Sequence, residues 1–322
     1  MTKEIDLVLE GGGVKGLATA GAVIQLLESG YTCQRAAGTS VGAIAAALVA
    51  AGADARGLRA AMERLQLRKI PDRTIPRARG FSEGFSLLTA SSLYKGDYIR
   101  DWLFDELKAL GVVTFKDLRR EDKGDDANLT DEQRYKLVVM ATDVSRGLLL
   151  RLPWDYAGLF NRPPDDECVA DAVRMSLSIP FYFRPCTLTR IPTGEPSVIV
   201  DGGVLSNFAV EIFDRTDGEK GRWPTWGVSL LPDLPEGLRA ISPLLGPGFV
   251  PPMELMKQVV ATAFVGHDQT HMNRPDVRDR TIEIDTTGVG ITDFRLSPEE
   301  RSALLEKGRA AAKTFLAGRK SE

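Results

Sequence analysis

Two successive strand–turn–helix units occupy the amino-terminal end of the chain and restrict its fold more than any other feature. Residues 5–9 are an apolar run that predicts a buried strand, and a glycine-rich turn at 11–16 and a helix at 17–27 follow. The order then repeats, with a second turn at 38–42 and an apolar helix at 43–51. Because strands that alternate with helices form parallel sheets, this order predicts an α/β fold with a mostly parallel central sheet.

The rest of the chain continues this pattern without an internal repeat or a clear linker. We therefore expect residues 1–322 to form a single domain, with residues 215–322 as its C-terminal part. Residues 69–96 carry several prolines and glycines, which predict a long connection over the sheet and make it a candidate lid. Further strands are expected at 136–141, 198–200, 225–230 and 280–284, and further helices at 54–68, 97–110 and 296–317.

The composition excludes several functional classes. The formal net charge is -3, which argues against nucleic acid as a partner because phosphate binding needs a basic surface. No apolar run is long enough to span a bilayer, and the first residues lack a signal-peptide pattern. We therefore expect a cytoplasmic protein whose membrane contact, if any, is peripheral. The three cysteines lack paired spacing, which predicts neither disulfides nor a zinc site. Two apolar segments, 154–160 and 242–256, either face lipid or fold onto the protein's own core, and the sequence favours neither.

The second turn is a candidate nucleophile elbow. Its residues, Gly38-Thr39-Ser40-Val41-Gly42, match the pattern G-x-S-x-G. A nucleophilic serine must project from a sharp strand-to-helix turn, where Gly38 and Gly42 relieve crowding. Val41 lies at the start of the following helix, whose free N–H groups favour negative charge. The pattern alone fits an ordinary tight turn equally well, and the apolar helix that follows favours the elbow.

The first turn has two interpretations. It comprises Gly11, Gly12, Gly13, Val14, Lys15 and Gly16. It satisfies the dinucleotide fingerprint G-x-G-x-x-G, but the acidic residue expected about twenty positions later is missing from residues 31–36. Alternatively, consecutive glycines allow backbone N–H groups to point at one oxyanion, with Lys15 adding positive charge nearby. Each such donor contributes about 3–4 kcal/mol to transition-state stabilisation.

A serine nucleophile needs a base, and the chain offers histidine or carboxylate candidates. The only histidines are His267 and His271, and the order Ser40, Asp201, His267 matches that of a hydrolase triad. The two histidines are also four residues apart, as in a metal site, but no third ligand is evident. Asp201 ends an apolar strand and precedes Gly202 and Gly203, so it is either the base at the active edge of the sheet or an ordinary turn aspartate.

Taken together, several stretches of the sequence resemble the patatin-like phospholipase family. They are the glycine turn 11–16, the elbow 38–42, residues 141–143, the block 176–185 that begins Ser176-Leu177-Ser178, and Asp201-Gly202-Gly203. The resemblance spans about residues 5–210. One departure is Ala209, where the family pattern leads us to expect a proline.

The resemblance implies a three-layer α/β/α fold and calcium-independent hydrolysis of acyl esters, often phospholipids, with no metal or cofactor. It implies a dyad in which Ser40 attacks the ester and Asp201 accepts its proton, with Gly202 and Gly203 supporting the base. It further implies an oxyanion hole at residues 11–16, chiefly the N–H groups of Gly12 and Gly13. Two other functions remain open: a nucleotide-binding protein that uses the first turn, and a binding protein with a degenerate site.

Overall fold

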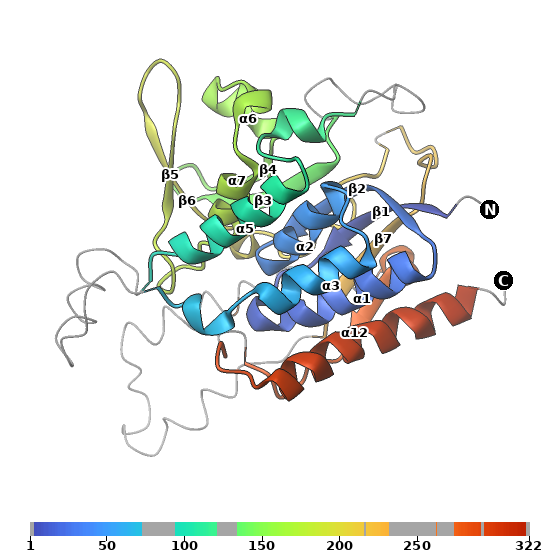
Figure 1. The fold of residues 1–322 in the computed structure, drawn as a ribbon. Helices are drawn as coiled ribbons and strands as arrows, with labels where there is room; N and C mark the ends of the chain where they lie inside the picture. The colour runs from blue at the N-terminus through green and yellow to red at the C-terminus, as the bar shows by residue number, and fades with distance from the viewer. Residues whose placement is uncertain are drawn as a thin grey trace, which may run out of the picture.

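The computed structural model describes residues 3–72, 94–120, 134–215, 217–231, 262, 274–290 and 293–319. At its centre lies one sheet of eight strands, in the order β5-β6-β3-β2-β1-β7-β8 with β4 paired to β3 (Figure 1). The strands are β1 Glu4–Leu9, β2 Thr32–Thr39, β3 Leu137–Asp143, β4 Leu148–Leu152, β5 Cys186–Thr189, β6 Pro196–Asp201, β7 Thr225–Leu230 and β8 Thr281–Ile284.

Five neighbouring strands, β3, β2, β1, β7 and β8, run parallel. Their short apolar sequences suit burial on both faces, as parallel sheets require. In β1, for example, Leu7, Val8 and Leu9 are all buried. The other three strands, β4, β5 and β6, pair antiparallel, so the sheet is mixed. Strands β1, β2, β3, β6, β7 and β8 lie where the sequence predicted strands, whereas β4 and β5 were not predicted.

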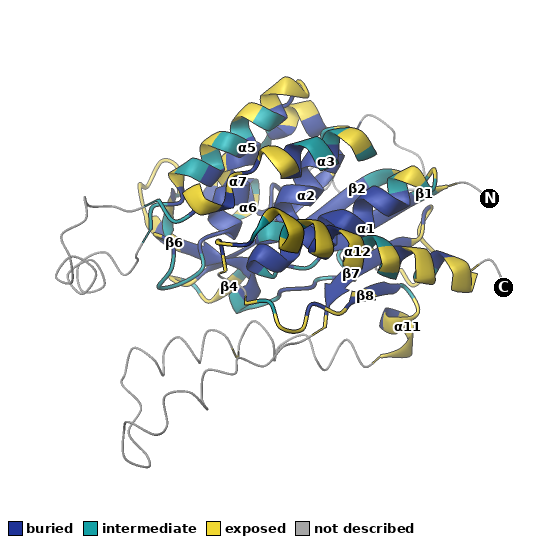
Figure 2. Ribbon diagram, turned by 60° about the horizontal axis from the view of Figure 1, so that its bottom comes forward, coloured by how far each residue is buried: buried dark blue, intermediate teal, exposed yellow. Residues whose placement is uncertain are grey.

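The helices are α1 Gly16–Glu28, α2 Val41–Ala50, α3 Ala55–Arg64, α5 Asp97–Ala109, α6 Trp154–Phe160, α7 Val169–Ser176, α11 Pro275–Arg278 and α12 Pro298–Arg319. Helices α1, α2 and α7 pack on the strands, while α3 and α12 lie against α1. Figure 2 shows that α12 turns a buried side toward α1 and an exposed side outward. Residues beyond 215 thus add β7 and β8 to the central sheet and α12 to its helical cover.

The contact between α1 and α12 depends on glycine, because the two backbones approach closely. A Cβ at Gly308 would lie 1.8 Å from the carbonyl oxygen of Ala18, and a Cβ at Gly21 would lie 2.1 Å from that of Leu305. We expect Gly308→Ala to lower the free energy of unfolding by about 1–3 kcal/mol, since the helices must separate. Urea unfolding would measure this loss.

The matched control is Gly318→Ala on the same helix, where an added Cβ meets no atom within 4 Å. We expect that variant to be as stable as the wild type or slightly more stable, because alanine favours a helix. Equal stability of Gly308→Ala and the wild type would contradict the close packing.

Three expectations concern surfaces and connections. Of the two alternatives for residues 154–160, packing on the core is the one observed, because Trp154, Tyr156 and Phe160 are all buried. The apolar pattern of this segment comes from packing, and α6 was not predicted. Residues 242–256 and most of the candidate lid, 73–93, lie outside the described residues. In the part of the chain that the structure describes, no helix has both the length and the apolar character needed to cross a membrane.

Candidate active site

Strand β3 aligns the ends of two other strands. Its first half pairs parallel with β2, up to Thr39 opposite Met140. Its second half pairs antiparallel with β6, beginning with Asp201 opposite Ala141. Strand β4 pairs with residues 139–143 along one edge of β3. Strands β2 and β6 therefore both pair along the opposite edge, where they run toward each other. Their carboxyl ends therefore meet at adjacent positions of β3, next to Ser40.

Ser40 lies in a tight turn between β2 and α2. Its backbone has φ 52° and ψ -128°, an uncommon conformation for a residue with a side chain. The flanking glycines allow this turn, because other backbone atoms occupy the space beside them. A Cβ at Gly38 would lie 2.6 Å from the nitrogen of Ala43, and one at Gly42 would lie 2.3 Å from the carbonyl oxygen of Leu9. The geometry is that of a strained serine elbow.

Ser176 holds the backbone of this elbow and was not predicted to do so. Its Oγ accepts the N–H of Ser40 at 2.8 Å and donates to the carbonyl oxygen of Met140 at 2.6 Å. Ser176 is fully buried at the end of α7. The sequence contained it in the block 176–185, but no spacing rule identified its contact with Ser40.

Asp201 is fully buried next to Ser40. Its Oδ1 accepts the N–H of Gly203 at 2.9 Å. Burial raises the pKa of Asp201 to about 7, while the Ser40 hydroxyl and the Gly203 N–H act against this increase. Within the described residues, Ser40 Oγ and Asp201 Oδ2 have no hydrogen-bond partner. The hydroxyl is thus close enough to affect the carboxyl, but the two do not form a regular hydrogen bond in this conformation. Such contacts often tighten only when substrate binds.

The two glycines that follow Asp201, Gly202 and Gly203, serve different purposes. The N–H of Gly203 fixes the Asp201 carboxyl, as described above. At Gly202, an added Cβ would lie 2.5 Å from the carbonyl oxygen of Met140, so only glycine allows this close approach to β3. The carbonyl oxygen of Gly202 also accepts the hydroxyl of Thr142 at 3.3 Å.

The glycine turn 11–16 lies directly against Ser40. A Cβ at Gly11 would be 2.8 Å from the Cβ of Ser40, and one at Gly12 would be 2.3 Å from Cδ1 of Leu230. Gly13 has φ 57°, which favours glycine. In the described part of the chain, the N–H groups of Gly11 and Gly12 donate to no protein group. Both N–H groups therefore remain available to an acceptor from outside the described chain.

The remaining residues of the turn connect it to α1. A Cβ at Gly16 would lie 2.4 Å from Cγ1 of Val41, so the start of α1 packs on the elbow. Val14 and Lys15 are both buried. The structure thus brings all the predicted elbow and glycine-turn residues together with Asp201.

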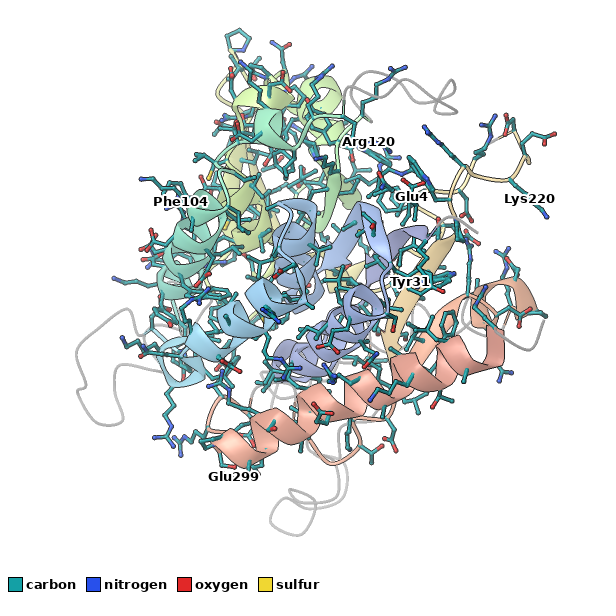
Figure 3. All side chains as sticks on the ribbon, turned by 45° about the vertical axis from the view of Figure 1, so that its right-hand side comes forward. Glu4, Tyr31, Phe104, Arg120, Lys220 and Glu299 are labelled. Atoms are coloured by element: carbon teal, nitrogen blue, oxygen red, sulfur yellow. The ribbon has the colours of Figure 1, made fainter. Side chains whose placement is uncertain are left out.

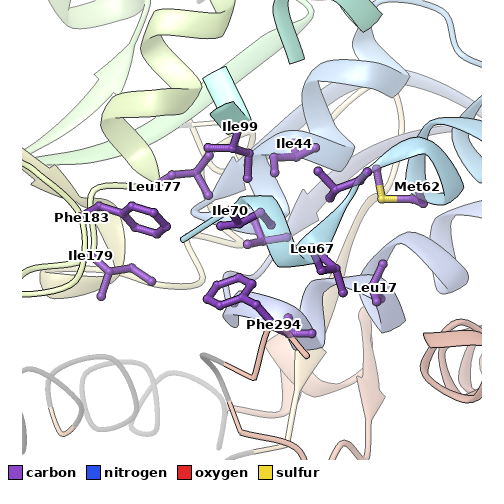
Figure 4. Close-up of a pocket in the computed structure, with 14 residues that line it drawn as sticks. Leu17, Ile44, Met62, Leu67, Ile70, Ile99, Leu177, Ile179, Phe183 and Phe294 are labelled. Atoms are coloured by element: carbon purple, nitrogen blue, oxygen red, sulfur yellow. The ribbon is translucent and has the colours of Figure 1, made fainter. Parts of the chain in front are cut away.

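An apolar cavity adjoins these residues (Figure 4). It is lined by 14 residues with only apolar side chains or none, and its volume is about 30 Å³. Gly13, Val14 and Val41 form part of its wall, and Leu177, Ile179, Phe183 and Phe294 contribute from distant segments. One water molecule needs about 10–15 Å³ of such a cavity, so this one is small and side chains must move before an acyl chain can enter.

The histidine hypotheses concern residues outside the described ranges, since both His267 and His271 lie there. Among the described residues, no three His, Cys, Asp or Glu side chains gather as metal ligands would. The described site therefore consists of one serine, one carboxyl, backbone donors and an apolar cavity.

Residues 7–214 match the family model described as patatin-like phospholipase. The chain belongs to this family, and the predicted α/β patatin-like fold is confirmed. Membership of the family supports a lipid acyl hydrolase activity and hence lipid substrates.

The chain is 36% identical to the protein YqhO of Bacillus subtilis over 97% of this chain and 98% of that protein. It is 28% identical to the NTE family protein Mb2594 of Mycobacterium bovis over 98% of this chain, but spans only 46% of that protein. Among solved structures, VipD from Legionella pneumophila has a TM-score of 0.53 at 19% identity, covering 98% of this chain and 67% of VipD. A chain of the ExoU–SpcU complex from Pseudomonas aeruginosa has a TM-score of 0.51 at 19% identity, covering 98% of this chain and 53% of that chain. These structures share its fold.

Proposed function

We propose that this protein is a serine lipid acyl hydrolase, which cleaves acyl esters such as those of phospholipids through Ser40, Asp201 and an acyl-enzyme. The observation that carries the proposal is the meeting of β2 and β6 on β3, which brings a strained serine beside a buried carboxyl. The glycine turn against Ser40 supports the same reaction, because its free N–H groups suit an oxyanion. Because the glycine turn lies against Ser40, we favour a role in oxyanion binding over a role in nucleotide binding.

In the first half-reaction, Asp201 accepts the proton of the Ser40 hydroxyl as Oγ attacks the ester carbonyl. A pKa of about 7 suits this task, because the carboxyl is substantially ionised near neutral pH and remains basic enough to accept a proton. The carbonyl oxygen becomes an oxyanion, and the N–H groups of Gly11, Gly12 and Gly13 stabilise it, with Val14 and Val41 as further donors.

The tetrahedral intermediate then collapses. The bond between the carbonyl carbon and the alcohol oxygen breaks, and protonated Asp201 returns its proton to the leaving alcohol. The acyl group remains on Ser40. In the second half-reaction, Asp201 accepts a proton from water, which attacks the acyl-enzyme, and the fatty acid leaves as Ser40 Oγ regains a proton.

The apolar cavity beside the site is suited to an acyl chain, which is the group attached to the reacting carbonyl. Each buried methylene contributes about 0.8 kcal/mol, so a cavity that holds several methylenes would favour longer chains. We expect Ile179→Trp, which adds bulk to the cavity wall, to lower kcat/KM for p-nitrophenyl decanoate by about 10–100-fold. The expected change with p-nitrophenyl acetate is under about 3-fold, since that substrate needs little of the cavity.

Ile191→Trp is the matched control, because Ile191 is 43% exposed and does not line this cavity. It should leave the ratio of decanoate to acetate activity unchanged. An unchanged ratio in Ile179→Trp would remove the cavity from the binding of the acyl chain.

A fluorophosphonate probe tests the proposed reaction, because it traps an activated serine as a stable adduct. We expect the probe to label Ser40, as identified by peptide mass spectrometry, and the protein to hydrolyse short-chain p-nitrophenyl esters. Labelling of Ser40 would also exclude the degenerate binding protein. A protein that neither reacts with the probe nor hydrolyses any ester would contradict the proposal.

We also propose that residues 1–322 act as one domain. The support is that residues beyond 214 contribute β7 beside β1 and α12 against α1. The cytoplasmic location and the peripheral membrane contact stay predictions.

A further inference from the structure

The carboxylate of Glu10 lies where three segments of the site meet. Glu10 directly follows β1 and precedes the glycine turn. Its Oε1 accepts the side-chain N–H of Asn207 at 3.0 Å. Its Oε2 accepts the backbone N–H of Leu230 at 2.7 Å and the hydroxyl of Ser229. One side chain thus joins the start of the glycine turn, the segment after Asp201 and the end of β7.

Asn207 extends this connection to the nucleophile. Its Nδ2 also donates to the carbonyl oxygen of Gly11 at 3.0 Å. Its side chain lies against the Cα of Gly11, since a Cβ there would be 2.5 Å from Asn207 Oδ1. The same Cβ would be 2.8 Å from the Cβ of Ser40. Asn207 therefore holds Gly11 against Ser40.

Leu230 provides the second connection. Its backbone N–H is bound by Glu10, and its side chain packs on Gly12, where a Cβ would lie 2.3 Å from Leu230 Cδ1. Glu10 thus supports Gly11 through Asn207 and Gly12 through Leu230. Both glycines carry N–H groups that donate to no protein group among the described residues.

We propose that Glu10 and Asn207 are positioning residues, which set the distance between the oxyanion-binding N–H groups and the Ser40–Asp201 pair. This inference rests on the proposed function. Neither side chain needs to touch substrate, because each acts through the backbone of the glycine turn. Asn207, Ser229 and Leu230 all donate to the Glu10 carboxylate, which suits a carboxylate that accepts at both oxygens.

The first test is Glu10→Gln. The glutamine NH₂ group would replace one of the two carboxylate oxygens and would face a hydrogen-bond donor there. We expect kcat for p-nitrophenyl butyrate to fall about 10–100-fold, since a displacement of about 1 Å in catalytic geometry costs roughly that much. We expect KM to change by less than about 3-fold, because the lost interaction is one that strengthens in the transition state. The acid limb of the pH profile should stay near the pKa of about 7 of Asp201.

Asn207→Ser provides a second variant if Glu10→Gln does not fold, and the same fall in kcat is expected. The double variant should lose less than the product of the two single losses, because both residues act on Gly11 through the connection from Glu10 to Asn207. Strictly multiplicative losses would overturn that connection.

Glu4→Gln is the matched control. Glu4 lies at the other end of β1 (Figure 3) and accepts the indole N–H of Trp223 at 2.9 Å and the side-chain N–H of Gln34 at 3.2 Å. It should lower the melting temperature and leave kcat within about 2-fold of the wild type. A Glu10→Gln variant that is less stable but keeps wild-type kcat would overturn the positioning role, while the proposed function would stand. An inactive wild type would overturn both.

Discussion

Replacing Ser40 by alanine is expected to lower kcat/KM for p-nitrophenyl butyrate by about 10⁴-fold or more. The hydroxyl is the nucleophile of the proposed reaction, and removal of such a group leaves only the contribution of the oxyanion hole and binding. The fluorophosphonate adduct should disappear with it. Initial-rate kinetics and intact-mass measurements on the purified variant would provide both values.

Two controls separate the loss of the nucleophile from a loss of structure. Alanine keeps a Cβ at the strained φ of 52°, so the Ser40→Ala melting temperature should stay close to that of the wild type. Ser29→Ala changes a serine at the far end of α1 and should keep full activity. Turnover by Ser40→Ala above about one tenth of the wild-type rate would contradict the proposed role of Ser40.

The sequence predicted the parallel part of the fold well because its signals are local. The apolar runs of β1 and β7 and the helical spacing of α1 can each be recognised within a window of some ten to fifteen residues. The predicted strand at 225–230 coincides with β7. The edge strands β4 and β5 were missed, since strands of five and four residues carry little pattern.

The meeting of Ser40 and Asp201 could not be derived from such local patterns. Asp201 was expected at the active edge because it ends a strand, an argument that holds for parallel strands. Strand β6 is antiparallel, and its end reaches Ser40 only because β3 continues for residues 141–143 beyond its pairing with β2. This register depends on residues about 60 and 160 positions apart, and only the family resemblance suggested it.

The polar residues that support the site were missed for a related reason. Ser176, Glu10 and Asn207 each act through two or three hydrogen bonds to distant segments. A single polar residue has no spacing that distinguishes it from a surface residue. The aromatic residues of α6 left two alternatives open, because apolar content alone does not distinguish a lipid-facing segment from a buried one.

Asp201 carries a cost in stability that its proposed role explains. Its pKa is raised from 3.8 to about 7 by burial. Between about pH 4 and pH 7, the unfolded chain has released this proton while the folded protein retains it, so the free energy of unfolding decreases as pH rises through this range. The stability that the protonated carboxyl contributes is complete below about pH 4 and lost above about pH 7. The contribution is about 4 kcal/mol for a shift of about three pKa units.

Asp201→Asn is therefore expected to lower kcat/KM by about 10³-fold or more and to raise stability. Asparagine keeps an oxygen for the Gly203 N–H and removes the buried charge, but its NH₂ group has no partner. We therefore expect the free energy of unfolding to increase by about 1–3 kcal/mol at pH 8. The gain should shrink at pH 5, where wild-type Asp201 is protonated in the folded state. Wild-type kcat/KM should fall about tenfold per pH unit below about pH 7.

Thermal melts and denaturant unfolding at both pH values, together with a pH–rate profile, would measure these effects. Asp143→Asn is the matched control, because Asp143 is equally buried on β3 but accepts the N–H groups of Ser145 and Arg146 and lies 3.8 Å from the Arg146 guanidinium. That variant should lose stability at pH 8 and keep the acid limb of the wild type. An Asp201→Asn protein that is less stable than the wild type at pH 8 would contradict the burial cost, and one with full activity would exclude Asp201 as the base.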